Sequence, residues 1–188
     1  MTIAAPRWIA GPGVAVVWPG GMALMAPDTS PALAERVWTR LRREPQLGTF
    51  LKALSETAER GFLDLPPFAI AVVNGGHCHV AVRGGYKVLL EGPSGTETLS
   101  GVDITTWAER VVATPDRVVF SAPGIDLESE SAPLGDGIVP AGALLLGEPA
   151  PAPVSAPASS ASPSRPAEPS PQPAPAPEAV APPPDRKS

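Results

Sequence analysis

FAIAVVNGGHCHVAVRGGYKVLLEGPSGTETLSG, residues 68–101, is the stretch that decides the fold. Apolar and polar residues alternate along it, and the alternation breaks at Asn74-Gly75, at Gly84-Gly85 and at Pro93–Gly95. Asn-Gly between two apolar runs is a strong hairpin signal, and a double glycine within a strand pattern indicates a bulge or a close approach of backbone. The stretch therefore predicts a meander of strands near 68–73, 78–83, 86–91 and 96–99.

The residues before and after this meander predict the remaining elements. Strands are expected near 14–18 and 21–26, with a turn at Pro19-Gly20. Ser30 is placed to cap a helix that begins at Pro31 and ends at Pro45, and a second helix is expected over about 47–60. Further strands are expected at about 107–113 and 117–121, whereas 122–147 reads as loop apart from one strand at 143–146.

This order of elements favours an α+β fold, with a mostly antiparallel sheet and two helices packed on one face. The last part of the chain differs sharply in composition, because about half of the 27 prolines follow Gly147 and no aromatic residue does. Such a segment buries too little apolar surface to offset its ordering entropy. We therefore expect one domain over 1–147 and a disordered proline-rich linker or tail over 148–188.

Charge and cysteine content narrow the functional classes. Most of the net charge of −5 falls on residues 1–147, which is unfavourable for nonspecific nucleic-acid binding. Cys78 is the only cysteine, so no intrachain disulfide is expected. No signal peptide and no apolar run long enough to span a bilayer is recognisable, which predicts a cytoplasmic protein without membrane insertion.

The order of features in residues 14–121 resembles the metal-dependent (type 2C) protein phosphatase family. That family carries a Gly-Asp-Ser-Arg turn before an apolar strand, and the matching turn here is Gly84-Gly85-Tyr86-Lys87. Where the family places metal-binding aspartates, this chain has Pro27, with Asp28 one step later, and Gly85. The segment FSAPG resembles the family's Ser-Asp-Gly strand end, but Ala122 and Pro123 cannot ligate a metal. The resemblance implies a domain that has lost its catalytic carboxylates.

The chain also resembles the N-terminal region of actinobacterial proteins that carry a forkhead-associated (FHA), phosphothreonine-reading domain after a proline-rich linker. The resemblance rests on the FAIAVV hairpin, on Thr-Trp-Ala-Glu-Arg at 106–110 and on the Pro/Ala/Ser tail. No motif of the reader domain follows residue 147. The resemblance to these proteins implies a role in bacterial Ser/Thr kinase and phosphatase signalling.

Two clusters offer binding chemistry. His77 and His79 point to the same side of a predicted strand and could share a zinc or copper ion, or they could form a polar shoulder with Cys78 facing the core. Arg36, Arg40 and Arg43 form a basic stripe on the first helix, which could dock an acidic partner or a phosphate, or could be a solvated helix face.

Together these features predict a non-catalytic interaction or regulatory module of Ser/Thr phospho-signalling, tethered by the linker to a reader domain, with no cofactor. The expected partner is a protein that is phosphorylated or is itself a Ser/Thr kinase or phosphatase. The alternative is a divergent metal-dependent phosphatase or another hydrolase. The predicted interaction surface comprises Asp28, Arg36, Arg40, Arg43, Gly84, Gly85, Tyr86 and Lys87.

Overall fold

The computed structural model describes residues 5–58 and 61–147. The predicted tail over 148–188 and the last residues of the predicted second helix, 59–60, lie outside the described residues. The strands are β1 (Arg7–Trp18), β2 (Gly21–Met25), β3 (Phe68–Asn74), β4 (His77–Gly92), β5 (Gly95–Gly101), β6 (Ala108–Ala113), β7 (Arg117–Ser121), β8 (Ser131–Pro133) and β9 (Gly137–Leu146). The helices are α1 (Pro31–Arg43), α2 (Leu47–Ser55) and the 3-10 helix η1 (Gly61–Asp64).

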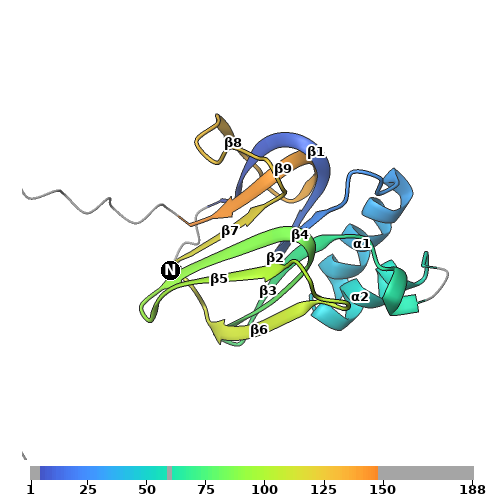
Figure 1. The fold of residues 1–188 in the computed structure, drawn as a ribbon, viewed down its shortest axis with the longest axis horizontal. Helices are drawn as coiled ribbons and strands as arrows, with labels where there is room; N and C mark the ends of the chain where they lie inside the picture. Colours follow the sequence, from blue (N-terminus) through green and yellow to red (C-terminus); the bar gives the residue numbers. More distant parts are fainter. Residues whose placement is uncertain (1–4, 59–60, 148–188) are drawn as a thin grey trace, which may run out of the picture. The chain divides into compact units, whose positions relative to one another are not determined.

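The strands form a mostly antiparallel sheet that closes into a barrel (Figure 1). In the described residues the pairing runs β2-β3-β4-β7-β9-β1, and β1 pairs in turn with β2. The remaining strands extend from this ring: β5 and β6 pair with β4, and β8 pairs with β1. The predicted α+β class with antiparallel pairing is confirmed, and closure of the sheet is a feature that the sequence pattern did not indicate.

The two predicted turns at Asn74-Gly75 and Pro19-Gly20 are confirmed. Asn74 pairs with His77 across Gly75-Gly76, and Trp18 pairs with Gly21 across the turn at Pro19-Gly20. Gly75 and Gly76 have φ values of 59° and 81°, which favour glycine. At the start of α1, the Ser30 hydroxyl accepts a hydrogen bond from the Leu33 backbone N–H at 3.2 Å, and Pro31 follows at the first helical position.

Two strands are longer than predicted because they bend instead of ending. The double glycine was expected to separate two strands, but β4 runs through it from His77 to Gly92. A straight strand would separate His77 from Glu91 by about 46 Å. Ala113 pairs with His77 and Arg117 with Glu91, yet four Cα steps reach at most about 15 Å. β4 must therefore turn sharply near Gly84-Gly85.

β1 bends in the same way, as its strongly curved ribbon in Figure 1 shows. The register between β1 and β9 shifts between Ile9 and Gly13, and a Cβ atom at Gly11 would lie 2.4 Å from the Gly142 Cα. Glycine is required at this crossing because the two backbones touch. The predictions of a strand at 14–18 and of a loop over most of 122–147 are corrected here: β1 begins at Arg7, β8 was not predicted, and β9 begins at Gly137.

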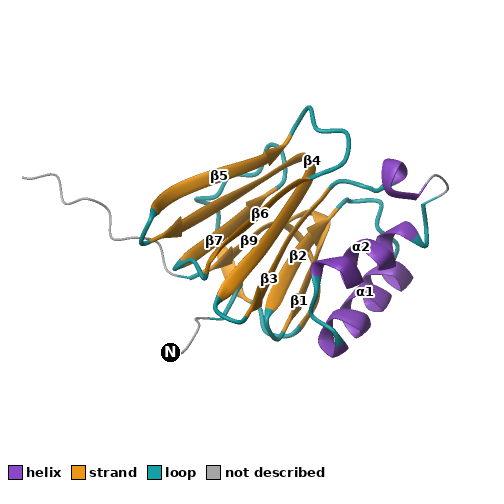
Figure 2. Cartoon of the chain, turned by 90° about the horizontal axis from the view of Figure 1, so that it is seen from below, coloured by secondary structure: helices purple, strands orange, loops and turns teal. Residues whose placement is uncertain are grey.

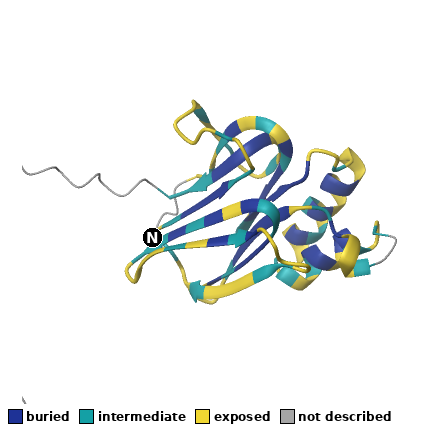
Figure 3. Cartoon of the chain, viewed as in Figure 1, coloured by how far each residue is buried: buried dark blue, intermediate teal, exposed yellow. Residues whose placement is uncertain are grey.

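Alternate side chains of the strands form two separate hydrophobic clusters on the two faces of the sheet. One lies inside the barrel and includes Val17, Leu24, Val88, Phe120 and Leu144. The other joins the buried side chains of α1 and α2 to outward-facing side chains of β1, β2 and β3. Figure 2 shows both helices beside β1 and β2 and away from β5. Figure 3 shows buried residues along the strands near the helices and exposed residues on β6.

Candidate binding groove

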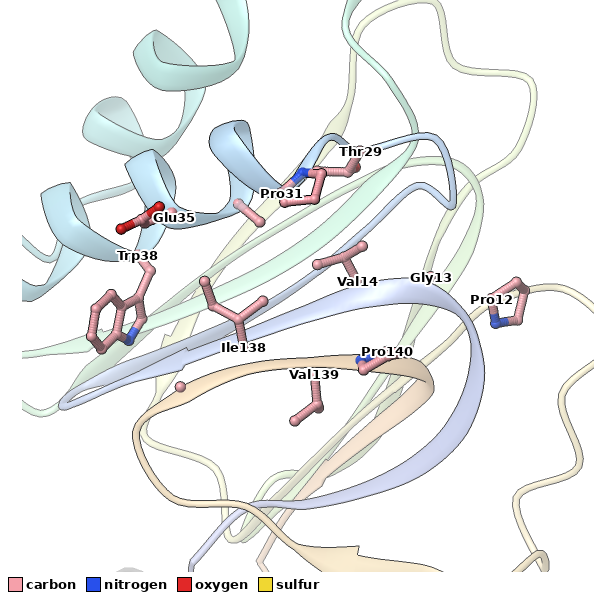
Figure 4. Close-up of a pocket in the computed structure, with 12 residues that line it drawn as sticks. Pro12, Gly13, Val14, Thr29, Pro31, Glu35, Trp38, Ile138, Val139 and Pro140 are labelled. Atoms are coloured by element: carbon pink, nitrogen blue, oxygen red, sulfur yellow. The ribbon is translucent and has the colours of Figure 1, made fainter.

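A groove lies between α1 and the first half of β9, and we call it the β9 groove. Its volume is about 560 Å³. Its lining is apolar apart from Thr29 and Glu35, and it comprises Pro12, Gly13, Val14, Thr29, Pro31, Ala34, Glu35, Trp38, Gly137, Ile138, Val139 and Pro140. Figure 4 shows Ile138 pointing toward α1, between Trp38 and Val14, whereas Val139 points away. A volume of this size is sufficient for several side chains of a ligand.

Trp38 on α1 is held in position by its neighbours. Its Nε1 donates a hydrogen bond to Asp136 Oδ1 at 2.6 Å, and Arg42 Nε lies 2.9 Å from Asp136 Oδ2. The Arg42 guanidinium also stacks over the indole ring, with its Cζ 4.7 Å from the ring centroid. Asp136 directly precedes β9. These contacts therefore hold α1, the wall of the groove, against β9, its floor.

The floor of the groove ends at a strand edge. One edge of β9 pairs with β1 through Gly137–Ala141 and Ala143–Leu145. The other edge pairs with β7 through Ala143–Leu146, and no strand in the described ranges pairs with this edge along Gly137–Ala141. Pro140 lies opposite Val14 and has no N–H, which indicates a non-hydrogen-bonded pair at that position. Because bonded and non-bonded pairs alternate, the Ile138 N–H and C=O then point outward, away from β1.

The Thr29 side chain, which also lines the β9 groove, provides a further polar group. Thr29 Oγ1 is buried and has no hydrogen-bond partner among the described residues. Thr29 precedes the Ser30 cap of α1, and its own backbone N–H bonds to the Ala26 carbonyl at 3.1 Å. Buried hydroxyls normally find a partner. The groove therefore combines apolar walls with a small number of hydrogen-bonding groups.

The predicted surface around the double glycine is filled by neighbouring side chains. A Cβ atom at Gly84 would lie 2.9 Å from Pro67 Cβ, and one at Gly85 would lie 2.8 Å from Pro123 Cγ. A Cβ atom at Gly101, on the paired strand β5, would lie 2.5 Å from the Arg83 carbonyl carbon. We call these three glycines and the two prolines the β4 corner. Its glycines permit the bend in β4 and its close packing.

Tyr86 follows the β4 corner and points inward. Its side chain is 3% exposed, and its hydroxyl donates a hydrogen bond to the Met25 carbonyl at 3.1 Å. Burial, together with the negative charge of Asp28, raises the pKa of Tyr86 to about 12. The structure thus places Asp28 near Tyr86, but the Tyr86 side chain is buried and contributes no exposed surface. Lys87 is exposed on β4, opposite Ser100 of β5 and Ser121 of β7.

The predicted arginine stripe is largely engaged with α2. Arg40 Nη1 lies 2.8 Å from Glu56 Oε1, and Arg36 Nη1 lies 4.0 Å from Glu56 Oε2. The hydrogen bond from Arg40 lowers the pKa of the Glu56 carboxyl. Arg43 is exposed and lines a smaller polar pocket with Arg40 and Lys52. This stripe lies on α1, outside the lining of the β9 groove.

The predicted histidine pair lies on β4. His77 is exposed, with Nδ1 3.2 Å from the Gly75 carbonyl oxygen, and His79 is partly buried. Cys78 between them is buried, which raises the pKa of its thiol to about 11. Among the described residues, no three His, Cys, Asp or Glu side chains come together in a way that could hold a metal ion.

The sequence did not indicate that Trp38, Asp136 and Ile138 form one site. Asp136 and Ile138 fall within the segment predicted as loop, and Trp38 lies on the first predicted helix. A usable signal was present, because a proline within the apolar run IVPAG is typical of an edge strand. Trp38 and Asp136 are about one hundred positions apart in the sequence, so no local pattern indicates that they are in contact.

No family model, curated protein or solved structure matches this chain. No helix in the described ranges is both long and apolar enough to cross a membrane.

Proposed function

We propose that this protein is a non-catalytic interaction or regulatory module of bacterial Ser/Thr phospho-signalling, and that it binds a protein partner through the β9 groove. The observation that carries the proposal is the open strand edge at Ile138 beside a tryptophan held in place by Asp136. Trp38 is partly exposed, and tryptophan is enriched among the anchors of protein–protein contacts. In this proposal α1 and α2 cover one face of the sheet, and the groove lies at the border of the covered face, between α1 and β9.

The β4 corner supports the non-catalytic part of the proposal. The type 2C phosphatase resemblance assigns a metal-binding carboxylate to the position of Gly85, and here a Cβ atom at Gly85 would lie only 2.8 Å from Pro123 Cγ. The hydroxyl of Tyr86 is turned toward the Met25 carbonyl. A two-metal mechanism depends on carboxylates that converge on the cations. At this corner, glycine and proline packing takes the place of such a group.

The signalling context rests on the two resemblances of the sequence. A proline-rich linker would tether this module to a phosphothreonine reader. When the reader binds its partner, the tether raises the local concentration of this module at the same partner. The partner is then a phosphorylated protein, a Ser/Thr kinase or a phosphatase, with the groove as the contact that does not depend on phosphate.

The proposal is tested by measuring catalysis and divalent-cation binding together. Calorimetric titration with Mn²⁺ and Mg²⁺ is run beside turnover of para-nitrophenyl phosphate. We expect no saturable cation binding and no turnover above that of a heat-denatured sample. Saturable binding with turnover would contradict the proposal and establish the alternative, a divergent metal-dependent phosphatase. An Asp28→Asn variant then reports whether that carboxylate takes part.

A further inference from the structure

We infer that the β9 groove takes an extended, basic segment of a partner protein, which adds as a short strand to the edge of β9 at Ile138. This inference rests on the proposed function, because it names the class of partner for the same site. It joins three features of the groove: the direction of the backbone groups, the position of the apolar pocket and the charge of the wall.

The backbone groups set the conformation of the bound segment. The Ile138 N–H and C=O point away from β1, and Pro140 contributes an outward C=O but no donor. A strand that pairs with Ile138 exchanges two hydrogen bonds with it and can donate a third to Pro140. Strand addition of this kind is a common mode of peptide recognition.

Pro140 also limits the length of the added strand. A missing donor on an edge strand interrupts continuous pairing, and natural sheets use proline there to prevent aggregation. The ladder at this edge therefore centres on Gly137–Val139, where Ile138 supplies the outward pair of groups. A short segment of a partner fits this edge, whereas a long strand of a second copy does not.

The side chains of the groove set the composition of the segment. Successive residues of a strand point to opposite faces, so every second side chain of the added strand lies on the α1 side of the sheet. One such side chain enters the apolar space among Trp38, Val14 and Ile138, which favours a β-branched or aromatic residue.

Charge favours a basic segment. Glu35 lines the α1 wall of the groove and is exposed. The other carboxylate at the groove, Asp136, is already paired with Arg42 and Trp38. A Lys or Arg next to the apolar anchor therefore meets Glu35, within a domain whose net charge is negative.

A second open edge provides the matched control. β6 pairs with β4 along one side only, and Val111 is 49% exposed on it. Glu109 and Arg110 beside it are charged, as is common on protected edges. A Val111→Pro substitution disrupts this second edge as Ile138→Pro disrupts the first, but it leaves the β9 groove intact.

The test is a random heptapeptide library displayed on phage and selected on the full 188-residue chain, with the Ile138→Pro variant as counter-selection. We expect alternating apolar residues with Lys or Arg between them. A synthetic peptide of the enriched sequence should bind about tenfold more weakly to Ile138→Pro, by fluorescence anisotropy, and equally well to Val111→Pro. In ¹⁵N-labelled protein, the Ile138 amide should shift and exchange more slowly with solvent.

Glu35→Lys is a second variant that leaves the strand edge unchanged. Selection on it should reverse the preferred charge of the peptides from basic to acidic. The inference is overturned if no sequence is enriched, if proline-rich or helical sequences are enriched, if Ile138→Pro binds equally well, or if Glu35→Lys leaves the charge preference unchanged. A concentration-dependent dimer that Ile138→Pro dissociates would assign the edge to a second copy and would also overturn it.

These outcomes separate the inference from the function on which it rests. Groove binding by proline-rich or helical peptides would end the strand-addition model but leave an interaction module. Turnover of para-nitrophenyl phosphate would end the non-catalytic proposal, whatever the peptides show.

Discussion

The β4 corner and the β9 groove are built from similar residues, but one is filled and the other is open. At the β4 corner, added Cβ atoms would meet Pro67, Pro123 or backbone within 3 Å. At the β9 groove, Pro12, Pro31 and Pro140 border a space of about 560 Å³. Glycine and proline therefore mark a bend that must close in one region and a strand edge that must stay unpaired in the other.

The largest expected effect is at the β4 corner. Gly101→Ala places a Cβ atom 2.5 Å from the Arg83 carbonyl carbon and 2.7 Å from the Gly84 nitrogen. Because both neighbours are backbone, the corner must open, and we expect the free energy of unfolding to fall by about 3 kcal/mol. Urea denaturation followed by circular dichroism measures this.

Gly48→Ala on α2 is the control for that substitution. No heavy atom lies within 4 Å of the added Cβ atom, so the same chemical change should be neutral or stabilise by up to about 0.5 kcal/mol. Equal stability of Gly101→Ala and the wild type would show that the corner is not closely packed.

Alkaline pH should destabilise the fold through two buried groups of β4, Cys78 and Tyr86. The pKa of Cys78 is raised from 9.0 to about 11 and that of Tyr86 from 10.0 to about 12, both mainly by burial. Each group ionises first in the unfolded chain, so its contribution is complete below the unfolded pKa and is lost as pH rises through the folded value. The urea midpoint should therefore fall between pH 9 and 12.

The double variant Cys78→Ala/Tyr86→Phe separates these two groups from the other titrating residues. It should be less stable at pH 7 but should lose less further stability between pH 9 and 12. A parallel decline in variant and wild type would mean that neither group controls the alkaline transition.

At the β9 groove the effect on stability should be smaller. Asp136→Ala removes the acceptor of the Trp38 N–H and the partner of Arg42, both at the surface. We expect a loss of about 1 kcal/mol in the free energy of unfolding. Asp136→Asn keeps an acceptor for Trp38 and should lose less, and a loss as large as that at Gly101 would contradict an open site.

The smallest effect is expected on the arginine stripe. Arg40→Gln breaks the exposed pair with Glu56 and should leave the urea midpoint unchanged within error, because exposed ion pairs add little net stability. If the stripe is the partner surface instead, Arg40→Gln should weaken the peptide or partner binding that Ile138→Pro leaves intact.

The comparison also shows how far the sequence predicts this fold. Asn74-Gly75 and Ser30-Pro31 gave correct boundaries because hairpins and helix caps depend on neighbouring residues. The apolar runs VAVVW and FAIAVV also indicate burial on both faces, because strands with few polar residues are buried on both sides. Both runs contribute to the barrel interior and to the cluster under the helices.

The features that the sequence does not predict depend on contacts between residues far apart in the chain. The pairing of β1 with β9 joins Gly13 to Ala141 and Arg7 to Leu145, and no local pattern indicates such distant partners. Arg83 gives a similar case, because its guanidinium donates to the Thr105 and Leu63 carbonyls from other segments. Asp28 lies near Tyr86, whose side chain is buried, and the β9 groove is visible only in the tertiary structure.

The pairing of β1 with β9 has a consequence for how the chain folds. Arg7 pairs with Leu145, so the barrel closes through residues from the two ends of the described range. Forming contacts of such long sequence separation costs loop-closure entropy before the stabilising interactions are made. Such contacts therefore slow folding. The helices and the β2–β4 pairs can form earlier from local contacts. Closure by β9 should thus be the late, slow event in refolding, and until then the edge of β1 and the barrel interior remain exposed to other unfolded chains.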